Sequence, residues 1–160
     1  MSIKVGDRLP KATLAKATPE GPQRVDSEEF FRGRKVALFS VPGAFTPTCS
    51  ARHLPGFVER IDELKAKGVD EVACTAVNDA FVLQAWAEQA GAEGKVTMLA
   101  DGNGAFAEEL GLTMDGSAFG LGKRGSRWSA IVDDGVVTDL NVEEPGAFNV
   151  SSADYMIGRL

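Results

Sequence analysis

Cysteine and histidine are scarce in this chain, which holds two cysteines and one histidine among its 160 residues. Two cysteines are too few for the disulfide framework of a small secreted protein. With one histidine, they also fall short of the four ligands of a structural zinc site. If Cys49 and Cys74 carry a function, we therefore expect them to act as thiols.

Long apolar runs and an excess of positive charge are also missing. No segment approaches the roughly 20 apolar residues that cross a bilayer, and residues 1–7 lack the apolar stretch of a secretory signal. We therefore expect a cytoplasmic protein, while a removed organelle transit peptide would leave the same sequence. The 17 basic and 23 acidic residues give a net charge of -6. Such a surface repels polyanions, so neither nucleic acid nor a membrane is an expected partner.

What the sequence does contain is an alternation of strand and helix patterns. Apolar runs at residues 36–41, 69–77 and 96–100 predict buried strands. Apolar residues at helical spacing predict a helix from Leu54 to about Gly68, and a second one that Asn78-Asp79 caps and that carries Trp86. Residues 105–110, closed by a glycine, predict a third and shorter helix.

The pattern changes after residue 128. Residues 129–133 and 136–140 flank Asp134-Gly135 and predict an antiparallel hairpin, and Ser151-Ser152 predict the cap of a last helix. This order predicts one α/β domain over residues 1–160, with a central mixed sheet and helices on both faces. The pattern fits a thioredoxin-like fold as well as other α/β sandwiches. Residues 116–125 hold four glycines, and we expect a mobile loop there.

Cys49 lies where the first predicted helix begins. Thr46 suits the N-cap and Pro47 the first helical position, so Cys49 falls in the first turn, where free N–H groups and the helix dipole favour an anion. The dipole contributes about 0.3–1 kcal/mol at an exposed site, less than one pKa unit. A nearby cation is therefore also expected, either Arg52 or Arg127. Local physics alone leaves a second interpretation open, a small buried cysteine without reactivity.

Pro55 interrupts the same helix. It removes a backbone hydrogen bond, and its ring crowds the carbonyl group of Ala51. We therefore expect a kink close to Cys49.

Several runs of this sequence closely resemble the peroxiredoxins. The centre of the resemblance is the Pro-x-x-x-Thr-x-x-Cys pattern from Pro42 to Cys49, in its run Pro42-Gly43-Ala44-Phe45-Thr46-Pro47-Thr48-Cys49-Ser50. Further matches are His53-Leu54-Pro55-Gly56-Phe57, Ala73-Cys74, Val77-Asn78-Asp79-Ala80-Phe81, Ala100-Asp101-Gly102 and Arg127-Trp128-Ser129. The resemblance covers nearly the whole chain and is strongest to the plant type II and mammalian fifth-class enzymes. It implies a thioredoxin-like fold and a thiol-dependent peroxidase.

The resemblance also implies roles for single residues. Cys49 would attack hydrogen peroxide or an organic hydroperoxide and become a sulfenic acid. Thr46 would hydrogen-bond the peroxide and the sulfur, and Arg127 would stabilise the thiolate and the charge on the leaving oxygen. The residues that shield the sulfur or bind the substrate would be Pro42, Gly43, Phe45 and Thr48. Neither a metal nor an organic cofactor is required.

Simpler interpretations stand beside these roles. Arg127 at a strand start suits a solvated edge residue, and Thr46 suits a helix cap. His53 is either a general base one turn past Cys49 or a packing residue, and packing is the commoner role. The aromatic side chains that would line a pocket for organic hydroperoxides, or else belong to the core or a dimer contact, are Trp128, Phe45 and Phe119.

Reduction of the sulfenic acid needs a second thiol. Some relatives carry a resolving cysteine after the hairpin, but residues 143–152 contain none. Cys74, inside an apolar strand, is either a buried structural cysteine or a resolving one, and a disulfide requires Cα atoms within about 7 Å. The resemblance therefore implies a one-cysteine mechanism with glutathione and glutaredoxin, or thioredoxin, as reductant. It also implies a homodimer formed through the active-site end.

A different functional class uses the same residues. A redox sensor also needs a reactive cysteine, and it passes the oxidation at Cys49 to a partner protein instead of turning over. A protein without redox activity is the third hypothesis. Turnover with a reductant distinguishes the first two, and the reactivity of Cys49 distinguishes them from the third.

Overall fold

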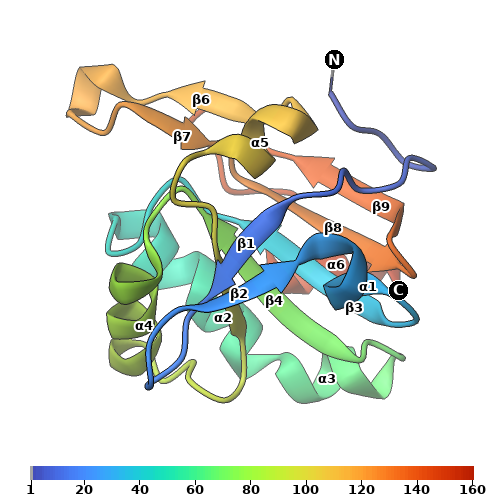
Figure 1. The fold of residues 1–160 in the computed structure, drawn as a ribbon. Coiled ribbons are helices and arrows are strands. Elements are labelled where there is room, and N and C mark those ends of the chain that lie inside the picture. The colour runs from blue at the N-terminus through green and yellow to red at the C-terminus, as the bar shows by residue number, and fades with distance from the viewer. Residues whose placement is uncertain (1) are drawn as a thin grey trace.

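The computed structural model describes residues 2–160, and in this part of the chain the main sheet has seven strands (Figure 1). They are β1 (Thr13–Lys16), β2 (Gln23–Asp26), β3 (Lys35–Ser40), β4 (Glu71–Ala76), β5 (Thr97–Ala100), β8 (Trp128–Asp133) and β9 (Val136–Val142). The order across the sheet is β2-β1-β5-β4-β3-β8-β9. Strands β3, β4 and β5 are parallel, and β1, β8 and β9 are added antiparallel at the two sides. The sheet is therefore mixed, as predicted.

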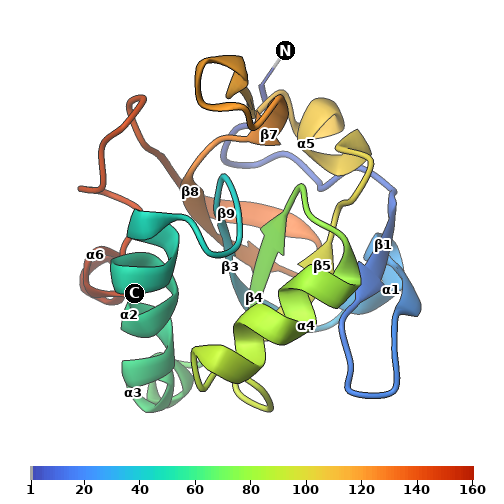
Figure 2. The ribbon, with the colours of Figure 1, turned by 90° about the vertical axis from the view of Figure 1, so that its left-hand side faces the viewer.

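Helices cover both faces of this sheet (Figures 1 and 2). One face carries α2 (Leu54–Glu59), α3 (Ile61–Ala66), α4 (Ala80–Gln89) and α6 (Ala153–Arg159), and the other carries α1 (Ser27–Phe31) and α5 (Ala105–Leu110). Two hydrophobic cores result, one on each face, with Phe39 and Trp86 in the first and Phe31 and Phe106 in the second. Because both faces are covered, a central strand such as β3 is apolar along nearly its whole length.

The caps predicted for α4 and α6, the glycine that closes α5 and the hairpin turn are confirmed. The Asp79 carboxylate accepts the N–H of Val82 at the start of α4, and Ser152 caps α6 in the same way. Gly111 adopts a left-handed conformation that ends α5. The Asp134-Gly135 turn of the β8–β9 hairpin has φ values of 50° and 80°, as a tight hairpin requires.

Other elements were not predicted. The β1–β2 hairpin and α1 are short and partly exposed, so they lack a continuous apolar signal. The segment expected to be a mobile loop instead contains the 3₁₀ turn η2 (Ser117–Phe119) and β7 (Lys123–Gly125), which pairs with β6 (Thr113–Asp115). Among the helices of residues 2–160, none has both the length and the apolar character needed to span a bilayer.

Candidate active site

The site lies at the edge of the sheet where the parallel strands end. Strands β3 and β4 finish side by side, with Val41 N–H bonded to Thr75 O at 3.2 Å. Residues 42–48 follow β3 and lead into the π-helix η1 (Cys49–His53). On the other side of β3, antiparallel β8 begins with Trp128 opposite Ser40. Arg127 therefore arrives beside the loop that carries Cys49, at the edge where open α/β sheets bind their ligands.

The turn that begins at Cys49 has π-helical geometry. Ser50 N–H still bonds to Thr46 O at 2.9 Å in the α-helical pattern, but Leu54 N–H reaches back one residue further, to Cys49 O. Pro55, which follows, has no N–H to donate, and the wider turn accommodates the missing hydrogen bond. The disturbance expected from Pro55 thus takes the form of a change in helical register.

The sulfur of Cys49 is buried and contacts an arginine. Arg127 Nη2 donates to Cys49 Sγ at 3.1 Å, and the side chain of Cys49 is fully buried. A guanidinium group stays charged at any ordinary pH, so this contact places a fixed positive charge next to the sulfur. Arg52, the other expected cation, is exposed and stacks on the ring of Phe148 at 4.6 Å. The structure therefore places Arg127, and not Arg52, on the sulfur.

His53 connects this arginine to the segment after β9. Its Nδ1 lies 2.7 Å from Arg127 Nη1, and its Nε2 lies 2.9 Å from Ser151 O. Burial first, and then the charge of Arg127, lower the pKa of His53 to about 3, while the contacts with Ser151 O and the charge of Glu143 oppose this shift. His53 is therefore neutral at pH 7, with its free lone pair directed at Arg127. The geometry makes it a partner of Arg127 rather than a base at the sulfur.

Thr46 and Gly43 shape the loop in front of the sulfur. Thr46 Oγ1 donates to Gly43 O at 2.7 Å, so the hydroxyl does not cap the helix and its lone pairs stay free to accept from a peroxide O–H. A Cβ atom on Gly43 would come within 2.8 Å of Arg124 Nη1 and 3.3 Å of Thr46 Cγ2. A side chain at this position would therefore displace the guanidinium of Arg124.

The other candidate residues lie at the rim of the loop or in the core. Pro42 and Thr48 are half-buried, while Phe45 is 47% exposed and has a left-handed φ of 65°. Phe119, on η2, is 81% exposed. Trp128 is buried in the core on the sheet face opposite to Cys49. Of the three aromatic residues considered for a substrate pocket, Trp128 therefore belongs to the core.

Cys74 lies inside the sheet, on β4, between Phe39 of β3 and Met98 of β5. Its side chain is fully buried. Burial, followed by the charge of nearby Cys49, raises the pKa of the Cys74 thiol well above its usual range. Within residues 2–160 both cysteines are free. Cys74 is thus a protonated thiol, which is a poor nucleophile.

Sequence reasoning missed several residues that support the site. Trp86 Nε1 donates to Ser50 Oγ at 2.9 Å, and Arg124 Nη1 donates to Pro42 O at 3.3 Å. Glu143 binds the segment that touches His53. These partners lie far apart in the sequence or act through backbone groups, so no local pattern relates them. The only usable signal is the position of Arg124 close to Arg127 and the hairpin.

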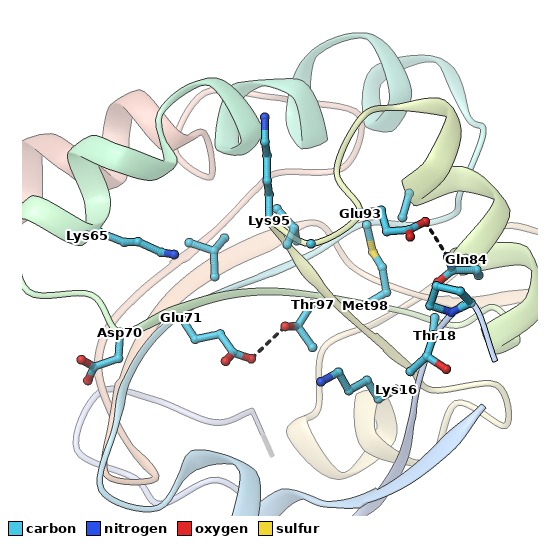
Figure 3. Close-up of a pocket in the computed structure, with 16 residues that line it drawn as sticks. Lys16, Thr18, Lys65, Asp70, Glu71, Gln84, Glu93, Lys95, Thr97 and Met98 are labelled. Carbon is cyan, nitrogen blue, oxygen red and sulfur yellow. Dashed lines mark hydrogen bonds between the residues drawn. The ribbon is translucent and has the colours of Figure 1, made fainter. Parts of the chain in front are cut away.

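A cavity of about 440 Å³ lies at the opposite end of the sheet (Figure 3). It opens where β4 and β5 begin, and Lys16, Lys65 and Lys95 line it. On its floor Thr97 Oγ1 donates to Glu71 Oε2 at 2.8 Å. Parallel strands start here, whereas Cys49 follows the end of β3, so this cavity is separate from the site built on Cys49.

A buried cysteine whose sulfur accepts a hydrogen bond from an arginine, at the edge of this sheet, defines a thiol-dependent oxidoreductase of thioredoxin-like fold. Comparison with known proteins agrees with this class, since residues 4–157 match the Redoxin family model. The chain is 51% identical to peroxiredoxin-2E-2, chloroplastic, of Oryza sativa subsp. japonica, over 99% of this chain and 73% of that protein. It is 45% identical to peroxiredoxin-2B of Arabidopsis thaliana, over 99% of this chain and 98% of that protein.

A solved structure is equally similar. The crystal structure of reduced Prx3 in complex with H₂O₂ from Vibrio vulnificus superposes with a TM-score of 0.94, at 52% identity and with 98% of both chains covered. The chain belongs to the peroxiredoxin family and is a thiol peroxidase. The resemblance found in the sequence is thereby confirmed, while a cytoplasmic location stays a prediction.

Proposed function

We propose that this peroxiredoxin reduces hydrogen peroxide and organic hydroperoxides by a one-cysteine mechanism, in which glutathione and glutaredoxin regenerate Cys49. The observation that carries this proposal is the complete burial of Cys74 within β4, where the pKa of its thiol is raised. Residues 143–152 contain no cysteine either. An external thiol is therefore the reductant that the chain leaves available.

The first step is a displacement at oxygen. The Cys49 thiolate attacks one peroxide oxygen, so that an S–O bond forms while the O–O bond breaks. The leaving oxygen departs as hydroxide or alkoxide and takes up a proton. Arg127, which donates to Sγ at 3.1 Å, is placed to stabilise the charge that moves onto the peroxide. The lone pairs of Thr46 Oγ1 accept the peroxide O–H.

The second step uses the external thiol. A glutathione thiolate attacks the sulfenic sulfur, and the S–O bond breaks so that hydroxide leaves and takes up a proton to become water. The mixed disulfide that remains is reduced by glutaredoxin through thiol–disulfide exchange. Cys49 is fully buried, so a tripeptide reaches its sulfur only after η1 opens. The π-helical register of η1 supports such opening, because π-helical turns are rare insertions in otherwise α-helical segments.

Turnover tests this proposal. Peroxide loss is coupled to NADPH through glutathione reductase and glutaredoxin, with a thioredoxin system as a parallel arm. We expect Cys49→Ser to abolish turnover and Cys74→Ser to retain most of it. A large loss in folded Cys74→Ser contradicts the one-cysteine mechanism, and activity with thioredoxin alone contradicts the choice of reductant. Consumption of a single equivalent of peroxide with every reductant favours a redox sensor instead.

We also propose that the chain forms a homodimer through the active-site end. Two large apolar side chains support this, because Phe45 and Phe119 are 47% and 81% exposed. Sedimentation velocity tests it, with Phe119→Asp as the disrupting variant. Phe81, 70% exposed on α4, supplies the matched control Phe81→Asp. A dimer that both variants leave intact, or a monomeric wild type, contradicts the proposal.

A further inference from the structure

The carboxylate of Glu143 organises the segment that follows β9. Glu143 is 9% exposed, and its Oε2 accepts the backbone N–H groups of Asn149, Val150 and Ser151, each at 2.8 Å. The same oxygen accepts the hydroxyl of Ser151 at 2.6 Å. The backbone N–H of Glu143 donates to Arg127 O at 3.0 Å. Glu143 therefore fixes both residues 149–151 and the backbone of Arg127.

Ser151, which Glu143 holds in place, contacts His53 through its carbonyl group. The carbonyl group of Ser151 can only accept, so His53 Nε2, at 2.9 Å, carries the imidazole proton. The Arg127 guanidinium can only donate, so His53 Nδ1, at 2.7 Å, must be the accepting nitrogen. The two contacts agree on one tautomer, and the Ser151 carbonyl group accepts its Nε2–H.

The same segment closes over this pair. The ring of Phe148 lies edge-on to His53 at 5.1 Å and lies 5.8 Å from the Arg127 guanidinium. Phe148 directly precedes the residues that Glu143 binds. Phe148 therefore packs against both His53 and Arg127 from the segment that Glu143 binds.

We propose that Glu143 is a positioning residue of the peroxidase site. By holding Ser151 it anchors the Nε2–H side of His53, and His53 in turn directs the Arg127 guanidinium at the Cys49 sulfur. The inference rests on the peroxidase reaction of Cys49 but not on the identity of the reductant. A purely structural role for Glu143, in which it fastens a surface loop, is the alternative.

Glu143→Gln tests the proposal, because it keeps the shape of the side chain and removes its charge. Glu144→Gln is the matched control, since Glu144 is the exposed neighbour. The readouts are the single-turnover rate of Cys49 with hydrogen peroxide and the pH profile of its alkylation. For Glu143→Gln we expect a rate at least tenfold lower and an alkylation midpoint about one pH unit higher, a tenfold change in ionisation. We expect Glu144→Gln to stay within twofold of the wild type.

A double mutant separates positioning from structure. If Glu143 acts through Arg127, Glu143→Gln has no further effect on the peroxide rate in an Arg127→Gln background. An undiminished effect in that background overturns the proposal, and so does a folded Glu143→Gln with the wild-type rate. A wild type whose Cys49 does not react with peroxide contradicts the peroxidase function instead, so the two failures are distinguishable.

His53 supplies a direct readout, because it is the only histidine in the chain. The ¹⁵N chemical shifts of its imidazole should show a single Nε2–H tautomer in the wild type and a mixture, or a protonated ring, in Glu143→Gln. Unchanged shifts overturn the proposal. If Glu143→Gln does not fold, Ser151→Ala decides the matter, since it removes only the hydroxyl contact. A threefold or greater loss of rate then supports the proposal, and a wild-type rate overturns it.

Discussion

Trp86 donates its indole N–H to Ser50 Oγ at 2.9 Å, and this bond joins α4 to the π-helical turn that carries Cys49. Trp86→Phe keeps a buried ring and removes the bond. We expect it to lower the free energy of unfolding by about 1 kcal/mol and to speed the alkylation of Cys49 roughly fivefold, because η1 opens more often. Urea denaturation and timed alkylation measure the two effects. Ser50→Ala removes the same bond and should have the same two effects. An unchanged alkylation rate of Cys49 in both variants would contradict the link between this bond and the opening of η1.

Arg127 serves two partners at once, the Cys49 sulfur and His53 Nδ1. Lysine keeps the charge but not the planar fork that reaches both atoms. We expect Arg127→Lys to slow the reaction with peroxide about 100-fold, and Arg127→Gln to slow it at least as much. Stopped-flow fluorescence measures the rate, with exposed Arg52→Gln as the control. A rate for Arg127→Gln within threefold of the wild type would show that the contact is not catalytic.

His53 makes the stability of the protein depend on pH. Its pKa is about 3 in the folded chain and 6.5 as the ordinary value, so between these limits the unfolded chain binds more protons. Stability therefore falls as the pH drops below 6.5, by about 2 kcal/mol at pH 5 compared with pH 7. Urea denaturation at the two pH values measures the difference.

The other buried acidic groups with shifted pKa values do not lower the stability of the protein between pH 7 and pH 5. Burial raises the pKa of Asp101, which gives the opposite sign. For Glu143, burial raises the pKa, but the hydrogen bonds that it accepts, led by that of Ser151, outweigh burial and lower the pKa overall. Its contribution is therefore lost only below about pH 4.5. His53→Gln should abolish the difference between pH 5 and 7, and equal stability of the wild type at both values contradicts a buried neutral histidine.

Gly43 and Arg124 occupy neighbouring space in front of the site. A methyl group on Gly43 meets Arg124 Nη1 at 2.8 Å, so Gly43→Ala should displace the guanidinium from Pro42 O and destabilise the protein by about 1 kcal/mol, the loss of one hydrogen bond. In a double mutant with Arg124→Ala the two losses should sum to more than the measured loss, with a coupling of about 1 kcal/mol. Denaturation of the four proteins measures it. Strictly additive losses would mean that the clash is not what Gly43 avoids.

The sequence predicted those elements whose residues are buried on both faces. Strands β3, β4 and β5 appear as apolar runs because helices cover the sheet on both sides. The pairing of β1 with β5 and of β8 with β3 was not predicted in detail, because strand order depends on contacts between distant residues. The β6–β7 hairpin was missed since its strands have three residues each and are largely exposed.

The same division applies to the site. Cys49, Thr46 and Arg127 were predicted because the runs that contain them resemble those of the peroxiredoxins, and the structure places Arg127 on the Cys49 sulfur. Glu143 was not, because its carboxylate meets backbone N–H groups, which every sequence offers. A side chain that binds backbone groups does not require particular residue types as partners. The sequence therefore does not reveal the contact, and the folded structure does.

The position of Arg127 late in the chain has a consequence for synthesis of the protein. Cys49 leaves the ribosome long before Arg127 and before Ser151, whose carbonyl group contacts His53. Domains fold as units, and contacts between such distant residues form late. A nascent chain therefore carries Cys49 without its Arg127 contact until the segment through Ser151 has been made.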